Sequence, residues 1–359
     1  MPSLILVAII LLPLLLLAPI PHLQTWLATH LSHALTLLTH RRNQPKQSHE
    51  IVSLRVYPIK SCRGLTLPRT KLLQHGLDLD RRWMIVDATT HTFLTIRQNP
   101  RMTLITTALT PDTTEATETL HLSITVPAAS SSSSRTTTIT IPAHPTPAWL
   151  AAHTTLATDI RIWDTTTDGH IYDAAINAPL SNFLGRDVAL VYKGPTPRIL
   201  QGNGAPRRLG REQATNFPDV HPVLLASEAS LAELNGRLVA QGEEKITVER
   251  FRPNVVVRGE VAWEEDTWKT VRIGGTKLEL DVVARCARCQ VPNVEPATAV
   301  KHKKQPWDTL MAYRRVDEGM KYKPCFGMLS APRQEGEIAV GMRLEVLEET
   351  TKHRYIAGF

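Results

Sequence analysis

The chain has 359 residues, a formal net charge of +7 at pH 7, four cysteines and 42% hydrophobic residues. This length exceeds one ordinary hydrophobic core, so we expect two packed domains plus an appendage. The positive charge is diffuse and lacks the dense basic stripe with interleaved aromatic residues that nucleic-acid binders carry, so nucleic acid is not expected as a partner. Four cysteines agree with a reducing compartment, because secreted proteins often carry a disulfide framework.

The N-terminal segment is strongly apolar. Residues 4–20 carry no charge and come close to the roughly 20 residues that cross a bilayer. We expect residues 1–21 to be a transmembrane anchor, because a cleaved signal peptide usually has a basic segment before its apolar run and none is present here. Residues 22–50 then form a basic linker, in which residues 22–38 suit an interfacial helix. Arg41, Arg42 and Lys46 follow the apolar run, and positive flanks face the cytosol, so the folded body is expected there.

Runs of β-branched residues begin at residue 51 and are separated by turn residues. The runs at 51–57, 83–86 and 93–96 predict short strands of a β-rich N-terminal domain that covers residues 51–185. Residues 110–138 are rich in Thr and Ser, which predicts an elongated hairpin tip without chemistry of its own.

The second domain is expected over residues 186–359. Strand-like runs lie at 188–192, 223–226, 255–257, 271–273 and 344–347, and a capping-box pattern at Ser230 predicts a helix through Leu238. The segment Gly202-Asn203-Gly204 lacks the third glycine of a dinucleotide-binding loop. Many strands and few helices predict an α+β, β-rich protein whose second domain is a mixed, mostly antiparallel barrel.

Residues 285–296 give the strongest sign of chemistry, because Cys286 and Cys289 lie among arginines. Guanidinium groups lower the pKa of a neighbouring thiol, and the thiolate is the form that binds a soft metal or attacks an electrophile. A strand-like run at 278–283 precedes the pair, and Pro292 and Pro296 stop any helix after it, so the cysteines are expected where a strand enters a loop. Four interpretations stay open: a metal-cofactor ligand, half of a zinc site, a dithiol redox motif, or two half-buried structural thiols.

Arg288-Cys289 followed by Val294-Glu295-Pro296 resembles the cysteine loop of MOSC-domain proteins, specifically the mitochondrial amidoxime-reducing component family. Other segments resemble that family in its order, and together they span about residues 51–347: 56–62, 80–87, 97–101, 251–254 and 313–315. The resemblance implies a MOSC N-terminal β-barrel-like domain over residues 51–185 and a MOSC mixed β-barrel domain over residues 186–359.

The resemblance implies a molybdenum–molybdopterin cofactor (Moco) with a cysteine thiolate as metal ligand. Cys289 occupies that position and is the expected metal ligand and catalytic residue, whereas Cys286 is expected to pack nearby. The residues that match the family's cofactor positions are Lys60, Ser61, Arg81, Asp219, Arg252, Asn254, Arg288 and Cys289. The cations suit a buried phosphate, and the carboxylate and amide suit pterin donors, while ordinary salt bridges or turn roles remain alternatives for them. At Ala287 and Leu329 the family can present hydroxyl groups, so any contact there is expected through the backbone or is lost.

The activity implied by the resemblance is reduction of N-hydroxylated compounds such as amidoximes, N-hydroxyguanidines and hydroxamic acids. The electrons are expected from an external donor, because the sequence has no dinucleotide-binding fingerprint and no cysteine set for an iron–sulfur cluster. By resemblance the donor is cytochrome b5, reduced by NADH-cytochrome b5 reductase. The expected location is a membrane, the mitochondrial outer membrane rather than the endoplasmic reticulum, with the body facing the cytosol.

Two other functions compete with the reductase. One is a cofactor-binding or carrier module related to the C-terminal domain of molybdenum-cofactor sulfurase, which we disfavour because no pyridoxal-phosphate domain precedes the MOSC part. The other is a membrane-tethered interaction protein whose site has decayed. The joint presence of Lys60, Arg81, Arg252 and Cys289 argues against decay.

Overall fold

A computed structural model of the chain describes residue 45 and residues 47–112, 119–128 and 136–358. The expected anchor at 1–21, most of the expected linker at 22–50 and the serine run at 130–134 lie outside the described residues. Among the residues described, no helix is long and apolar enough to cross a membrane. The residues from Gln47 onward form one compact unit.

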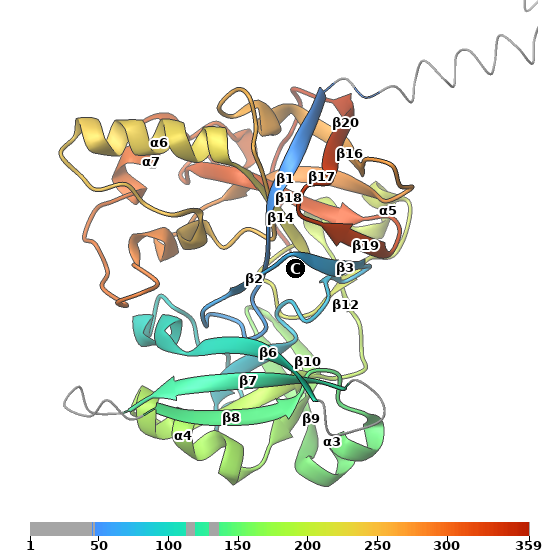
Figure 1. Cartoon of the computed structure of the whole chain (residues 1–359), viewed down its shortest axis with the longest axis vertical. Helices are drawn as coiled ribbons and strands as arrows, with labels where there is room; N and C mark the ends of the chain where they lie inside the picture. Colours follow the sequence, from blue (N-terminus) through green and yellow to red (C-terminus); the bar gives the residue numbers. More distant parts are fainter. Residues whose placement is uncertain (1–44, 46, 113–118, 129–135, 359) are drawn as a thin grey trace, which may run out of the picture. The chain divides into compact units, whose positions relative to one another are not determined.

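Within this unit, seven strands close into a barrel (Figure 1). β1 (Gln47–Val56) pairs antiparallel with two other strands of the barrel and thereby closes the ring. The order around the ring after β1 is β15 (Val255–Val257), β14 (Val223–Ser227), β18 (Cys325–Pro332), β17 (Glu279–Ala287), β16 (Trp268–Ile273) and β20 (Arg343–Glu349). β14 and β15 run parallel, whereas the other neighbours are antiparallel. The expected mixed, mostly antiparallel barrel is confirmed.

β1 belongs to this barrel, although its residues fall in the linker and N-terminal domain expected from the sequence. Its side chains Ile51, Leu54 and Val56 are fully buried. A register shift between Ile51 and Ser53 lets both Ile51 and Leu54 face the core, which strict alternation would forbid. After β1, the first described strand, the chain leaves the barrel to build the N-terminal sheets and then returns.

The N-terminal half holds two sheets that share a hydrophobic core. One contains β5 (Trp83–Asp87), β11 (Val188–Lys193), β10 (Thr165–Tyr172) and β9 (Thr154–Ile162), and the other contains β6 (Thr106–Asp112), β7 (Thr119–Pro127) and β8 (Thr136–Pro142). The Thr/Ser-rich segment, expected as a hairpin tip, thus also supplies strands of the second sheet. We expected residues 188–192 in the second domain, but β11 pairs with β5 and β10. The whole of β11 is buried, which suits the middle of a sheet covered on both faces.

Two further differences concern local structure. The helix α6 (Glu228–Ala240) begins before Ser230, because the Ser227 side chain accepts the hydrogen bond of the Ala229 N–H and caps the helix. Ser230 lies inside the helix, buried, and donates to Glu265 at 2.8 Å. Residues 93–96, expected as a strand, make only an isolated bridge between Phe93 and β5.

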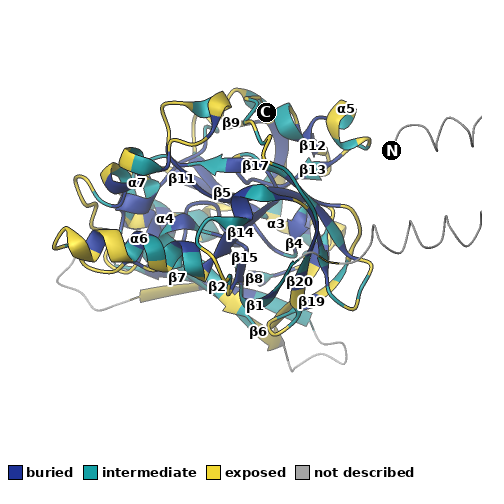
Figure 2. Cartoon of the chain, turned by 90° about the horizontal axis from the view of Figure 1, so that it is seen from above, coloured by how far each residue is buried: buried dark blue, intermediate teal, exposed yellow. Residues whose placement is uncertain are grey.

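The remaining elements are short; Figure 2 shows exposed residues concentrated on helices and loops and buried ones on the inner strands. The other strands are β2 (Leu65–Leu67), β3 (Arg69–Leu73), β4 (Gly76–Leu77), β12 (Arg198–Ile199), β13 (Ala214–Thr215) and β19 (Gly336–Ala339). The other α-helices are α3 (Pro147–His153), α4 (Ala174–Leu184), α5 (Pro206–Leu209) and α7 (Trp307–Tyr313). The 3-10 helices are η1 (Pro100–Leu104), η2 (Gly202–Gly204), η3 (Val248–Phe251), η4 (Glu264–Thr267), η5 (Val291–Asn293) and η6 (Glu318–Met320).

Candidate functional site

A pocket of about 430 Å³ lies where loops of the N-terminal sheets meet one end of the barrel strands. Its walls come from the loop after β1, the turn before β5, the loop at 217–221, the segment between η3 and β15, and the end of β17. All eight residues predicted from the sequence line it: Lys60, Ser61, Arg81, Asp219, Arg252, Asn254, Arg288 and Cys289. Residues up to 298 positions apart along the chain, Lys60 and Gly358, thus share this pocket.

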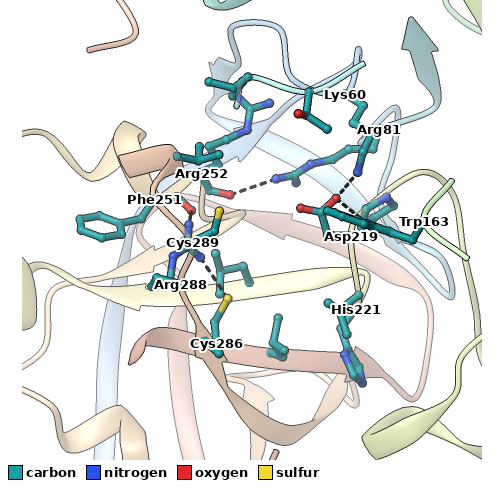
Figure 3. Close-up of a pocket in the computed structure, with 18 of the residues that line it drawn as sticks. Lys60, Arg81, Trp163, Asp219, His221, Phe251, Arg252, Cys286, Arg288 and Cys289 are labelled. Atoms are coloured by element: carbon teal, nitrogen blue, oxygen red, sulfur yellow. Dashed lines mark hydrogen bonds and ion pairs between the residues drawn. The ribbon is translucent and has the colours of Figure 1, made fainter. Parts of the chain in front are cut away.

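Lys60 lines the pocket, is buried, and forms hydrogen bonds with two other residues. Its Nζ donates to the Phe217 carbonyl at 2.8 Å and to the Asp219 carboxylate (Figure 3). Burial lowers the pKa of Lys60 to about 8, although the charge of Asp219 opposes this shift. The Asp219 side chain is 56% exposed, so the desolvation that raises its pKa is small, and Lys60 brings that pKa down to about 2. The pair is therefore ionised at neutral pH, and it differs from an ordinary surface salt bridge because the ammonium is dry.

Arg81 and Arg252 both lie against the ring of Tyr57. Their guanidinium carbons stand 4.4 and 4.2 Å from the centroid of the Tyr57 ring. Arg81 donates to Asp80 at 2.6 Å and to the Arg252 carbonyl at 3.1 Å. Burial, with the nearby charge of Arg81, lowers the pKa of Arg252 to about 10. The Nη2 atom of Arg252 is buried without a hydrogen-bond partner among the described residues, which leaves a donor ready for an anion.

Backbone strain marks the same corner of the pocket. Ser61, Arg81 and Arg252 all have left-handed backbone conformations, with φ of 71°, 45° and 58°. Such conformations are uncommon outside glycine and occur often at functional sites. Asn254 accepts from Arg81 at 3.2 Å and from the Leu224 N–H at 3.1 Å, so it holds Arg81 in place.

The cysteine pair lies where β17 enters a loop, as expected. Cys286 is in the last residues of β17 and Cys289 follows it. Arg288 is buried, and it donates to the Cys286 sulfur at 3.0 Å and to the Phe251 carbonyl at 2.9 Å. Burial raises the pKa of the Cys286 thiol, against the effect of Arg288. We expected Arg288 either to orient the cofactor or to act on Cys289; its guanidinium hydrogen-bonds to the Cys286 sulfur, and Figure 3 shows Cys289 on the side of Arg252.

The surroundings of the pair bear on the zinc interpretation and leave the redox and structural interpretations open. Both cysteines are free thiols. In the part of the chain that the structure describes, no group of three or more His, Cys, Asp or Glu side chains is placed to hold a metal ion.

Sequence reasoning took Asp219 from the loop at 217–221 as a site residue but did not name His221 of that loop, nor Tyr57, which packs against both arginines. His221 is buried and lines the pocket, and neither ring nitrogen has a hydrogen-bond partner among the described residues. Burial lowers the pKa of His221 to about 4, so its imidazole is neutral. Tyr57 supports both arginines. His221 stands two residues after Asp219, and that proximity was the available signal. Ala287 and Leu329 both line the pocket, so their side chains supply no hydroxyl there.

Comparisons with known proteins agree with this architecture. The family model of the MOSC domain matches residues 212–345, and that of the MOSC N-terminal beta barrel domain matches residues 48–187. The chain is 31% identical over 314 residues to mitochondrial amidoxime reducing component 2 of Rattus norvegicus, covering 84% of each chain. It is 30% identical over 312 residues to mitochondrial amidoxime-reducing component 1 of Homo sapiens, again covering 84% of each chain.

A second kind of relative is also found. Molybdenum cofactor sulfurase of Arabidopsis thaliana is 34% identical over 301 residues, which cover 79% of this chain and 33% of that protein. The match with the amidoxime-reducing components extends over most of both chains, whereas the match with the sulfurase covers most of this chain but only 33% of the sulfurase. The chain therefore belongs to the family of MOSC-domain proteins that includes the mitochondrial amidoxime-reducing components.

Proposed function

We propose that this protein is a molybdenum-cofactor-dependent reductase of N-hydroxylated compounds such as amidoximes, N-hydroxyguanidines and hydroxamic acids. One observation carries the proposal: a single pocket brings the Cys289 thiol together with buried cations and with polar groups that lack partners. The names of the relatives, amidoxime-reducing components and molybdenum cofactor sulfurase, support the same cofactor and the same substrate class.

The residues of the pocket fit a molybdopterin cofactor. Cys289 would be the thiolate ligand of the metal, a role that needs a soft donor. Lys60, Arg81 and Arg252 would hold the phosphate, because they are cations that line one pocket and Arg252 keeps an unpartnered donor. The unpartnered nitrogens of His221 would bond the pterin edge, as would Asp219. When bound, this group supplies the two-electron redox chemistry.

The reaction requires two electrons and two protons for each substrate molecule. The N–O bond of the amidoxime breaks, the oxygen leaves as water, and an amidine remains. The protein itself would orient the cofactor through the cations Lys60, Arg81 and Arg252. It would also keep a neutral, poorly hydrated wall beside the substrate, formed by residues such as Leu224 and Leu329. Such a wall limits side reactions with water.

The electrons in this proposal come from cytochrome b5, which NADH-cytochrome b5 reductase reduces. The net charge of +7 supports this donor class, because a positive protein attracts an acidic haem protein. The names of the relatives support a mitochondrial location.

Metal analysis and a reconstituted assay test the proposal. Purified full-length protein should contain molybdenum in stoichiometric amount and should reduce benzamidoxime when NADH, the reductase and cytochrome b5 are all present. Absence of molybdenum would refute the cofactor, and full activity with NADH alone would refute the external donor. Bound molybdenum without turnover from any haem donor would favour the alternative, a carrier module, which the similarity to the sulfurase supports.

A further inference from the structure

The segment after β20 returns to the pocket and is held there by its backbone. Asn203, in η2, donates to the Arg354 carbonyl at 2.9 Å and accepts from the Ile356 N–H at 2.7 Å. The same amide donates to the Val283 carbonyl of β17 at 3.2 Å. One side chain thus ties this segment to a barrel strand. We call residues 353–358 the strap.

Two buried charged residues hold the strap at further points. Asp317 accepts from the Tyr355 N–H at 2.8 Å, and Arg285 donates to the His353 carbonyl at 3.0 Å. Asp317 is 2% exposed, and its carboxylate lies 3.8 Å from the Arg285 guanidinium. The anchors therefore belong to the buried charge network of the barrel. Four successive residues, 353–356, are bonded through their backbones.

Two glycines let the strap approach closely. A Cβ on Gly202 would overlap the Ile356 carbonyl, and a Cβ on Gly319 would overlap the Tyr355 carbonyl. Gly202 also has a φ of +55°, a conformation that favours glycine. The packing of the strap therefore depends on residues from η2 and η6, which lie far apart in the sequence.

The strap presents Tyr355 to the pocket. The Tyr355 side chain packs against the cluster of Leu224, Ala284 and Leu329, beside Cys286. Tyr355 and Gly358 both line the pocket. We propose that the strap is a fixed wall of the pocket and that Tyr355 determines the size of the small molecule that the pocket admits. This inference rests on the proposed function only in identifying that molecule as an N-hydroxylated compound.

Thiol accessibility tests the wall without reference to turnover. Cys286 lines the pocket, whereas Cys62 and Cys325 are buried elsewhere and report whether the fold is intact. Labelling of Cys286 by iodoacetamide and by fluorescein maleimide is followed by peptide mass spectrometry in the purified full chain. Tyr355→Ala should raise the maleimide rate several-fold and the iodoacetamide rate less. The matched control is Tyr322→Ala, at a tyrosine that is 84% exposed and does not line the pocket, and it should change neither rate.

A glycine pair tests the anchoring. Gly202→Ala should push the strap away and raise maleimide labelling of Cys286, as Tyr355→Ala does. Gly210→Ala is the control, because Gly210 has a φ of +71° but nothing within 4 Å of its added Cβ. If either variant labels Cys62 or Cys325, Tyr355→Leu replaces it. Equal Cys286 rates in wild type and in folded Tyr355 and Gly202 variants would overturn the proposal.

Kinetics then separate this inference from the proposed function. In protein with full molybdenum content, Tyr355→Ala should lower KM for a bulky aryl amidoxime several-fold relative to KM for acetamidoxime, whereas Tyr322→Ala should change neither value. Changed labelling without any reductase activity in wild type would reject the proposed function and keep the wall. Normal activity with unchanged labelling and unchanged size preference would reject the wall.

Discussion

The two thiols of the candidate site differ in their contact with Arg288. Its guanidinium is bonded to the Cys286 sulfur and to the Phe251 carbonyl, so Cys286 is fixed in the protein's own hydrogen-bond network. Cys289 lies on the side of Arg252 (Figure 3). The two cysteines therefore have different surroundings, although both line the pocket.

We predict that Cys289→Ser removes molybdenum and activity together, because a hydroxyl is a poor ligand for a soft metal site. Cys286→Ala should keep most of both. Metal content per protein, measured after gel filtration, checks the prediction. Full molybdenum retention in Cys289→Ser would contradict the assignment of the ligand.

Lys60 predicts a pH dependence of anion binding. Its pKa of about 8 lies below the usual 10.5, so its charge is lost as pH rises through 8. The folded state therefore binds fewer protons than the unfolded state between pH 8 and 10.5. As a result, the Lys60 contribution to the free energy of unfolding increases as pH rises through that window. An anion that needs the charged ammonium should bind less well over the same range.

The measurement is the rise in melting temperature that inorganic pyrophosphate gives to cofactor-free protein at pH 7 and at pH 9.5. The rise should shrink at the higher pH in wild type, and Lys60→Met should show little rise at either pH. Lys269→Gln, at an exposed ion pair with Glu348, should behave as wild type. An equal rise at both pH values in wild type would contradict the role of Lys60.

His221 predicts a loss of stability in acid. Its folded pKa of about 4 lies below the unfolded value of 6.5, so the folded state binds fewer protons between these values. The contribution of neutral His221 to the free energy of unfolding is fully present above pH 6.5 and is lost as pH falls toward 4. At pH 5 the loss is about 2 kcal/mol. Urea unfolding at pH 7 and pH 5 should show a smaller loss in His221→Gln than in wild type. The exposed His153→Gln should leave the loss unchanged.

At the scale of elements, the site depends on how closely the barrel strands approach at the pocket. Gly327, in β18, has a φ of +77°, and its added Cβ would lie 2.6 Å from the Leu225 carbonyl of β14. Leu329, which lines the pocket, is two residues further along the same strand. A side chain at Gly327 would therefore push apart two strands that carry the pocket wall.

We predict that Gly327→Ala lowers the free energy of unfolding by clearly more than the about 1–2 kcal/mol expected for left-handed strain alone. Gly275→Ala measures that strain, because Gly275 has a φ of +74° and open space around its Cβ. Chemical denaturation of both variants gives the comparison. Equal losses would show that the close approach of β14 and β18 is not a constraint.

At the scale of the whole molecule, the pocket needs both halves of the chain. Lys60 and Arg81 come from the segments around the N-terminal sheets, whereas Arg252 and Cys289 come from the barrel region. The full sequence carries a formal net charge of +7 at pH 7. The proposed donor would therefore meet the molecule through long-range attraction, which salt weakens.

We predict that cytochrome b5-dependent turnover falls as ionic strength rises past roughly 0.1 M, where the Debye length is about 10 Å. The assay varies sodium chloride at fixed donor concentration, and turnover with a small chemical reductant is the control. Turnover that stays constant up to high salt with the haem donor would remove the electrostatic argument for this partner.

Much of the local structure could be predicted from the sequence. The runs at 83–86, 223–226 and 255–257 are strands, because β-branched and apolar residues between turn residues suit a buried strand wherever it pairs. The eight site residues also gather at one pocket. Their prediction came from matching short segments to a family, since composition and spacing alone left zinc, redox and structural interpretations of the cysteines open.

The identity of the site residues and the β-rich fold class could be predicted from the amino-acid sequence alone, because both are properties of short segments. Tertiary structure decided which sheet received β1 and β11, since a short apolar run has the same pattern in either sheet and its partner is chosen by distant residues. It also decided that Arg288 bonds Cys286 and that Asn203 and Asp317 hold the strap. Such contacts join residues from 2 to 153 positions apart, and side-chain direction at a site is fixed only when the surrounding walls are packed.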